Sequence, residues 1–386
     1  MWWAQIKFAR AAIRRRLLLL DRDHAPFSVC ITDQLQKRLH FIDREAAGAI
    51  KGMDGSGGAA RFLMRSLIEE SMTSSQLEGA ATTRVVAKEM LSTGRPPRDQ
   101  SERMIYNNYA AMSLIRERGK RPFSVGEILE LHTVFTTGTL ESEDHCGRLR
   151  VAEGNVLIFD KGSDIVLHTP PPAREVRERL QRLCDFANAQ DEDPFIHPVV
   201  KAIAIHFQIG YDHPFCDGNG RTARVLFYWA MMNAGYWLTE FLSISSVLKK
   251  SPGHYMRAYL YTEHDDSDMT YFVAQQLEVI QQSITALHDY IMRKSEQHKQ
   301  ALRALRMTHV AGTEMNYRQK ALLANALDNP DRGYSVAGHQ AAHQISYPTA
   351  LGDLSALVEA GLLEQGKRGR AHRFIPVVNL EDLLRT

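Results

Sequence analysis

Twelve consecutive residues, from His213 to Arg224, constrain this chain more than any other segment. The run reads His-Pro-Phe-Cys-Asp-Gly-Asn-Gly-Arg-Thr-Ala-Arg and lies between two apolar stretches that predict helices over 199–211 and 223–234. A Gly-Asn-Gly turn that opens a helix leaves backbone N–H groups unpaired at the positive end of the helix dipole. Such N–H groups form a ready anion-binding site. The run therefore predicts a site for a polyphosphate between two helices.

The side chains of this run suit proton transfer and phosphate binding. His213 has the type of side chain that exchanges a proton near neutral pH, although a lone histidine at a helix end more often caps or packs. Asp217 is a hard oxygen ligand for Mg²⁺, or alternatively the N-cap of the next helix. Arg221 and Arg224 share one helix face, where two cations beside a positive dipole end favour a bound anion over internal ion pairs. Phe215 is expected to anchor the loop in the core.

The run also matches the pattern HPFx(D/E)GNGRxxR at every specified position, and so it resembles the signature of Fic-domain proteins. His197-Pro198 and His206-Phe207-Gln208 resemble the same family, and the resemblance extends over residues 60–295. It implies a mainly α-helical fold, with a Fic-type helical bundle, a small β-hairpin flap and a C-terminal winged helix-turn-helix domain. The expected domains are an N-terminal helical region over 1–105, a Fic catalytic domain over 106–300 and a winged helix over 314–386.

This resemblance implies a protein adenylyltransferase, which moves AMP from ATP to a Ser, Thr or Tyr hydroxyl of a protein, including itself, and releases pyrophosphate. His213 would take the proton of the hydroxyl, and Asp217 would hold Mg²⁺. The implied phosphate-binding residues are Gly218, Asn219, Gly220, Arg221, Thr222, Ala223 and Arg224. Arg221 would contact the β-phosphate and Arg224 the γ-phosphate. Such a reaction depends mainly on positioning and charge stabilisation.

Other activities stay open at this level. The same residues could remove AMP from a modified target, or transfer another nucleotidyl or phosphate-containing group. A different class is a DNA-binding regulator whose Fic core senses a nucleotide. The intact His213 and Asp217 argue against such an inactive core.

A second segment, Ser74-Ser75-Gln76-Leu77-Glu78-Gly79, predicts the end of a helix. Without a cationic partner, Glu78 would oppose the dipole at this end. The segment resembles the inhibitory helix of the Fic family, (S/T)xxxE(G/N). The resemblance implies that Glu78 pairs with Arg224, where it would fill the space of the γ-phosphate, and that Ser74 fixes the helix by a local hydrogen bond.

Residues 156–168 contain two β-prone runs around a polar turn with a glycine, which predicts a hairpin. An isolated hairpin must pack on another element. In Fic proteins this hairpin is a flap, and its edge pairs with the target segment as an added strand. We therefore expect a protein target to present its hydroxyl to residues 155–168. Tyr255 resembles a tyrosine that stacks near the adenine, although an aromatic residue at helical spacing more often belongs to the core.

The remaining chain is expected to be largely helical, because apolar residues recur at three- or four-residue spacing. Helices are predicted over 6–19, 33–40, 59–77, 82–92, 100–118, 125–136, 173–189, 253–264 and 270–302. The formal net charge of +2 indicates no nucleic-acid coat, and the four widely spaced cysteines indicate neither a zinc site nor a disulfide framework. Leu17 to Leu20 is too short an apolar run for a signal peptide or a membrane span. We expect a cytoplasmic protein with no membrane partner, and a homodimer stays open.

The C-terminal module is predicted to contain helices over 317–327 and from Ser335 and Ser346, followed by a strand, a turn and a second strand. This order resembles a winged helix-turn-helix, with Ser346, Tyr347 and Thr349 leading the recognition helix. Lys367, Arg368, Arg370 and Arg373 cluster on the predicted wing. Residues 314–386 nevertheless carry eight Lys or Arg and eight Asp or Glu, unlike a strongly basic DNA-binding domain. DNA and a protein are therefore both candidate partners of this module.

Overall fold

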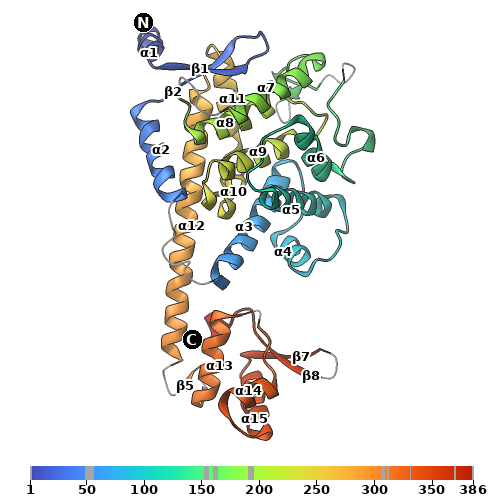
Figure 1. Ribbon diagram of the computed structural model, residues 1–386, viewed down its shortest axis with the longest axis vertical. Helices are drawn as coiled ribbons and strands as arrows, with labels where there is room; N and C mark the ends of the chain where they lie inside the picture. Colours follow the sequence, from blue (N-terminus) through green and yellow to red (C-terminus); the bar gives the residue numbers. More distant parts are fainter. Residues whose placement is uncertain are drawn as a thin grey trace. The chain divides into compact units, whose positions relative to one another are not determined.

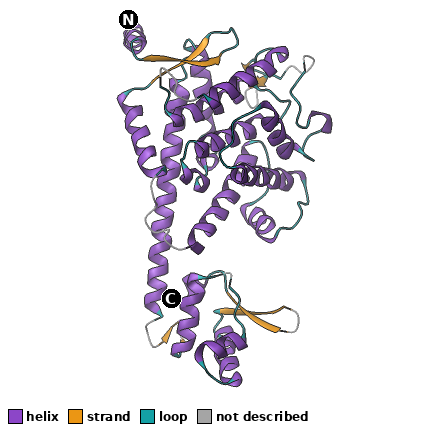
Figure 2. Cartoon of the chain, viewed as in Figure 1, coloured by secondary structure: helices purple, strands orange, loops and turns teal. Residues whose placement is uncertain are grey.

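The computed structural model describes residues 2–47, 56–151, 156–159, 164–189, 195–305, 309–310, 313–330, 332–368 and 371–384. Helices dominate these ranges, and the strands described there form separate two-stranded antiparallel sheets (Figure 2). The chain divides into two compact units, residues 1–50 with 62–287, and residues 51–61 with 288–386. The predicted mainly α-helical fold class is confirmed. No helix in the described ranges has both the length and the apolar character needed to cross a bilayer.

The elements of the first unit follow one another along the chain in Figure 1. They are α1 (Trp2–Ala11), β1 (Arg14–Leu20), β2 (Pro26–Cys30), α2 (Asp33–Ala46), α3 (Ser56–Leu77), α4 (Arg84–Thr93), α5 (Gln100–Arg118), α6 (Val125–Thr136), β3 (Ile158–Phe159), β4 (Val166–His168), α7 (Val176–Asn188), α8 (Pro198–Asp212), α9 (Asn219–Asn233), α10 (Ile244–Leu248), α11 (Pro252–His264) and the first part of α12 (Thr270–Ala304). Short 3-10 helices lie at Glu143–His145, Ala173–Glu175 and Trp237–Phe241. The helices predicted over 100–118 and 125–136 coincide with α5 and α6.

The helices α8 and α9 form the centre of this unit. Most residues of both helices are buried, including Phe207 on α8 and Trp229 on α9. A helix that is apolar on all sides must be enclosed by neighbours, and α9 contacts α8, α5 and α6 (Figure 1). The loop between α8 and α9 carries the signature run, so rigid packed helices hold both of its ends.

The helix predicted over 6–19 is wrong in its second half. Residues Arg14–Leu20 form strand β1, which pairs antiparallel with β2. Leu17 and Leu19 are buried while Leu18 is exposed, so the side chains alternate with the two-residue period of a strand. Pairing with β2 and burial of these two leucines determine the local structure, although leucine favours helices.

The second unit contains the C-terminal part of α12, β5 (His309–Val310), β6 (Thr313–Glu314), α13 (Tyr317–Asp328), α14 (Val336–His343), α15 (Tyr347–Glu359), β7 (Leu363–Arg368), β8 (Ala371–Pro376) and α16 (Leu380–Leu383). Three helices and a hairpin follow one another in the predicted order. Ser335 and Ser346 cap α14 and α15 by accepting hydrogen bonds from Gly338 N and Thr349 N. Leu323, Leu354 and Phe374 lie in the core of this unit. The assignment of the unit as a winged helix stays a prediction.

A buried ion pair joins α7 to the end of α8 in the first unit. Arg179 Nε donates to Asp212 Oδ1 at 2.8 Å, and the other guanidinium nitrogens donate to the carbonyls of Leu20 and Asp21. Both side chains are less than a tenth exposed. This pair therefore connects β1, α7 and α8 immediately before the signature loop.

We predict that Arg179→Met lowers the free energy of unfolding by about 3 kcal/mol, because Asp212 would be left buried without its cation. Urea unfolding of the purified protein measures this loss. Arg182→Ala is the matched control on the same helix, since the pair that Arg182 forms with Glu178 is exposed. Equal effects of the two substitutions would contradict the assignment of a structural role to the buried pair.

Candidate functional site

His213 occupies a left-handed backbone conformation at the end of α8, with φ of 44° and ψ of 60°. Its ring Nδ1 lies 2.7 Å from the carbonyl oxygen of Gly210. Because a carbonyl oxygen only accepts, Nδ1 carries the proton and the neutral ring keeps its lone pair on Nε2. Burial lowers the pKa of His213, although the Gly210 hydrogen bond raises it in part. The neutral imidazole therefore predominates at neutral pH, as a general base requires.

The helix α9 begins at Asn219, four residues before the predicted start at Ala223. Gly218 is its N-cap, with φ of 80°, and both the N–H and the hydroxyl of Thr222 donate to the Gly218 carbonyl at 2.9 Å. Ala223 follows, fully buried. The first-turn N–H groups of a helix have no acceptor within it. This turn is therefore the place where an anion would bind.

The carboxylate of Glu78 lies against this first turn. A Cβ atom added to Gly220 would stand 2.2 Å from Glu78 Oε1, so only glycine leaves room for the carboxylate there. The same Oε1 accepts from Arg224 Nη2 at 2.8 Å, which is the contact predicted from the sequence. Burial raises the pKa of Glu78, but the charges of Arg224 and Arg221 outweigh it and hold that pKa below its usual value. An ionised carboxylate thus occupies the positive end of α9.

Arg224 is 2 % exposed and its donors are directed at α3. Its Nε donates to Ser74 Oγ at 2.8 Å, and its Nη2 donates to the Ser74 carbonyl at 3.0 Å. Ser74 Oγ thus accepts from an arginine distant in the chain, and the predicted local helix hydrogen bond of Ser74 stays a prediction. Burial opposes the charge of Arg224, yet Glu78 raises the pKa of the guanidinium above its ordinary value.

A second carboxylate, Glu70, lies eight residues before Glu78 and anchors α3. It accepts from the hydroxyl of Ser243 at 2.9 Å, and from the N–H and hydroxyl of Ser245 at 3.0 and 2.5 Å. Glu70 is 2 % exposed, and burial raises its pKa. Glu70 was not predicted as a site residue, because nothing in the sequence distinguishes it from its neighbour Glu69. Glu70 fixes the helix that presents Glu78.

Asp217 and Arg221 lie on the other side of the turn. Asp217 Oδ1 accepts from Gly218 N at 2.6 Å, and Oδ2 lies 3.4 Å from Arg221 Nη2. The Asp217 side chain is 55 % exposed, and it is not the helix N-cap. Arg221 is completely buried, donates to the Phe135 carbonyl at 3.3 Å, and burial lowers its pKa. The carboxylate is therefore accessible to a cation, and the guanidinium behind it fixes its direction.

The loop itself is held by an imidazole that the sequence analysis did not single out. His132 on α6 accepts from Gly147 N at 3.0 Å through Nδ1, and its Nε2 donates to the Asp217 carbonyl at 2.9 Å. Its ring stacks on Phe215 with centroids 3.7 Å apart. Burial lowers the pKa of His132 to about 4, so the neutral form that both contacts need is stable at neutral pH. Phe215 is fully buried, which confirms its predicted role as an anchor.

Tyr255 on α11 lies near the same site. Its hydroxyl is 2.8 Å from Nε2 of His206, and its ring packs edge-on against Tyr259. Burial lowers the pKa of His206 to about 3 and raises the pKa of Tyr255. Tyr255 thus belongs to a buried aromatic cluster on α8 and α11, and its contact with an adenine stays a prediction.

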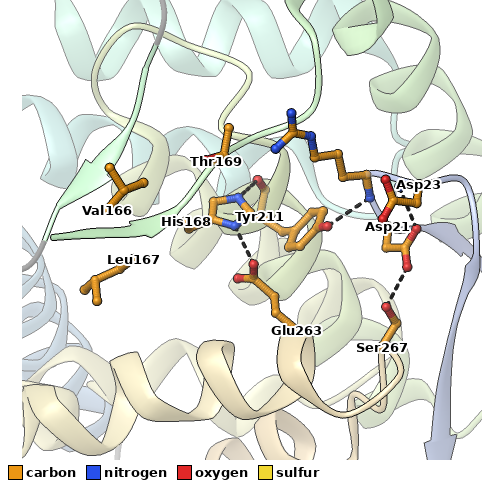
Figure 3. Close-up of a pocket in the computed structure, with 10 residues that line it drawn as sticks. Asp21, Asp23, Val166, Leu167, His168, Thr169, Tyr211, Glu263 and Ser267 are labelled. Carbon is orange, nitrogen blue, oxygen red and sulfur yellow. Dashed lines mark hydrogen bonds and ion pairs between the residues drawn. The ribbon is translucent and has the colours of Figure 1, made fainter.

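The predicted hairpin is present as β3 and β4, while residues 152–155 and 160–163 lie outside the described residues. His168 at the end of β4 contacts Glu263 Oε2 at 2.8 Å through Nδ1, and the Tyr211 carbonyl at 2.7 Å through Nε2 (Figure 3). These contacts fix the base of the hairpin two residues before His213. A polar pocket of about 290 Å³ lies beside them, between β4, α11 and the turn that joins β1 to β2. Phe159, Ile165 and Val166 on the hairpin are exposed.

Comparison with known proteins agrees with this geometry. Residues 122–231, which contain the complete signature run, match the Fic/DOC family. The chain therefore contains a Fic domain, and the predicted resemblance of the signature run to Fic-domain proteins is confirmed over these residues.

Individual relatives extend the comparison. The chain is 25 % identical over 209 residues to the Protein adenylyltransferase Fic of Nematostella vectensis, covering 52 % of this chain and 46 % of that protein. It is 27 % identical over 212 residues to the protein of the same name from Drosophila melanogaster, covering 52 % of this chain and 39 % of that one. The chain thus spans less than half the length of either relative.

Two solved structures share the fold. A Fic family protein from Desulfovibrio desulfuricans G20 superposes with a TM-score of 0.56 at 20 % identity, covering 88 % of this chain and 96 % of that one. A Fic domain containing signaling protein from Bacteroides thetaiotaomicron gives a TM-score of 0.53 at 19 % identity, covering 67 % and 96 %. At these identities the likeness concerns the fold alone.

We predict that NMR titration of labelled histidines gives His213 a pKa below the ordinary value of about 6.5. The sign follows from burial, which disfavours the imidazolium. Glu78→Gln should lower the pKa of His213 further, because the carboxylate favours the imidazolium. His213→Asn assigns the resonance. A pKa that rises on Glu78→Gln would contradict the placement of the carboxylate near the ring.

Proposed function

We propose that this protein is an autoinhibited protein adenylyltransferase, which transfers AMP from ATP to a Ser, Thr or Tyr hydroxyl of a protein, including itself. One observation carries the proposal. An ionised carboxylate, Glu78, lies against the glycine turn of α9 and pairs with Arg224. Beside it lies a histidine whose Nε2 has no hydrogen-bond partner among the described residues and can accept a proton. This is a phosphate site filled by a carboxylate from the same chain.

The proposed reaction begins when the target hydroxyl gives its proton to His213 Nε2. The hydroxyl oxygen then forms a bond to the α-phosphorus of ATP, and the bond from that phosphorus to the bridging oxygen of the β-phosphate breaks. Pyrophosphate leaves, and AMP stays on the target. The amides of Gly218, Asn219 and Gly220 would hold the phosphates at the positive end of α9, where the electrostatic stabilisation is already in place.

Asp217 fits the magnesium ion that such a reaction implies. Its carboxylate is more than half exposed and lies beside the N–H groups that would bind phosphate. One protein carboxylate together with substrate phosphates is a usual environment for Mg²⁺. When bound, the ion would neutralise charge on the phosphates, while Arg221 keeps the carboxylate oriented towards them.

The proposed inhibition by Glu78, which we call the brake, follows from competition for one arginine. The γ-phosphate of ATP and the carboxylate of Glu78 both require Arg224, and their like charges exclude each other. Arg224 is buried and held by Ser74, so it cannot turn to serve a second anion elsewhere. We propose that ATP binds productively only after Glu78 leaves the turn.

The hairpin β3–β4 is the proposed docking element for the target. It presents Phe159, Ile165 and Val166 to solvent, and its base is fixed to the residues before His213 by His168. An extended target segment could pair with its edge and bring a hydroxyl to the base.

The C-terminal unit supports a second candidate function, that of a DNA-binding regulator. Tyr347 at the start of α15 is 51 % exposed, next to the capping residues Ser346 and Thr349. Arg373 is a weaker candidate for a DNA contact, because its side chain lies over Gly333 instead of extending from the wing. Salt-dependent binding of a specific duplex without any AMP transfer would favour this alternative.

We predict that Glu78→Gly activates AMP transfer at least about tenfold, because it frees Arg224 for the γ-phosphate. The measurement is transfer of label from α-³²P-ATP with Mg²⁺ to the protein itself and to added lysate proteins. His213→Ala in the Glu78→Gly background should abolish labelling. Equal labelling before and after the Glu78 change would rule out the brake, and labelling without His213 would rule out the base.

We also predict that Gly220→Ala in the Glu78→Gly background lowers AMP transfer about 100-fold, because the new methyl group enters the anion site. Steady-state kinetics with ATP measure this change. Gly352→Ala is the control, since a Cβ at that helical glycine meets nothing within 4 Å. If Gly220→Ala kept full activity, the phosphates could not lie where Glu78 lies.

A further inference from the structure

Most carbonyl groups of the signature loop accept hydrogen bonds from Arg150, Asn219 or His132. Arg150 donates from Nη2 to the Asp212 carbonyl at 3.2 Å, from Nε to the His213 carbonyl at 2.7 Å, and from its backbone N–H to the Pro214 carbonyl at 3.0 Å. Asn219 Nδ2 donates to the Phe215 carbonyl at 2.8 Å, and His132 donates to that of Asp217. Arg150 thus donates hydrogen bonds to three consecutive carbonyls.

These contacts fix the direction of the loop amides. In a trans peptide the C=O and the following N–H point in opposite directions within one plane. The N–H groups that follow these carbonyls are engaged as well. His213 N donates to the Ile209 carbonyl at 3.1 Å, and Phe215 N donates to Asn219 Oδ1 at 3.0 Å. The backbone on both sides of His213 is therefore fixed.

Arg150 also joins both ends of the hairpin. The residue itself immediately precedes the segment that leads into β3, and its guanidinium donates to the carbonyl of Pro171, three residues after β4. The side chain is 7 % exposed. A single buried guanidinium therefore connects the proposed target-docking hairpin to the backbone of His213.

We propose that Arg150 is a positioning residue, which holds His213 in register with the hairpin so that the base meets a hydroxyl docked there. This inference rests on the proposed function. The role requires the branched guanidinium of an arginine, because its donors must reach carbonyls in three directions. The single ammonium group of a lysine cannot do so with the same geometry. No local pattern in the sequence indicates this role of Arg150, since its partners lie 21 and more than 60 residues away.

The kinetic test compares Arg150→Gln and Arg150→Lys with Arg148→Gln, all in the Glu78→Gly background. Arg148 is exposed two residues earlier and is the matched control. We expect Arg150→Gln to lower kcat for protein labelling about 100-fold, because small misplacement of a base has effects of that size. The KM for ATP should stay within about threefold, because Arg150 contacts no residue proposed to hold the phosphates. Unchanged kcat in Arg150→Gln would overturn the proposal.

A second readout does not depend on AMP transfer. The charge of Arg150 disfavours the imidazolium of His213, so Arg150→Gln should raise the pKa of His213 in an NMR titration, and Arg150→Lys should leave it nearly unchanged while still lowering kcat. If Arg150 only stabilised the fold, both variants should show the same loss of kcat, without this separation between kcat and the pKa of His213. If the Glu78→Gly parent transfers no AMP, the proposed function fails. A His213 titration that Arg150→Gln leaves unchanged would still reject the positioning role.

Discussion

The pairing of Glu78 with Arg224 at the first turn of α9 is the interaction on which the rest of the site depends. A helix start with unpaired N–H groups and two buried arginines is unstable without an anion. In this structure the anion is the carboxylate of Glu78, in the turn that follows α3, which the charges of Arg224 and Arg221 keep ionised. The segment that ends at Glu78 therefore stabilises this helix start and occupies the space beside it.

The surrounding structure makes this site rigid from several directions. Glu70 attaches α3 to the start of α10, while His132, Asn219 and Arg150 hold the loop between α8 and α9. These partners come from segments far apart in the chain, which explains why a short loop can keep a strained histidine in one conformation. Preorganised amides cost no rearrangement when charge develops on a substrate.

The sequence predicted the parts of this site that are local. Helices α5 and α6 were predictable to the residue, because Asp99 and Ser124 cap them before a clear apolar period. The signature run and the Glu78 segment were found through short motifs. Glu70, His132 and Arg150 were not, since their roles arise from contacts with distant backbone groups that leave no local pattern. The strand β1 was missed because pairing with β2 outweighs the helix preference of its leucines.

The glycine at position 220 has a genetic consequence. The Glu78 carboxylate and the proposed phosphates use the same space above this residue, so any side chain introduced there excludes both. Under the proposed function, variants released from inhibition can arise on α3 and the turn that follows it, where Glu78 can be lost alone. They cannot arise at the start of α9. A genetic screen for gain of activity should therefore return substitutions on α3 and the turn that follows it, and none at the start of α9.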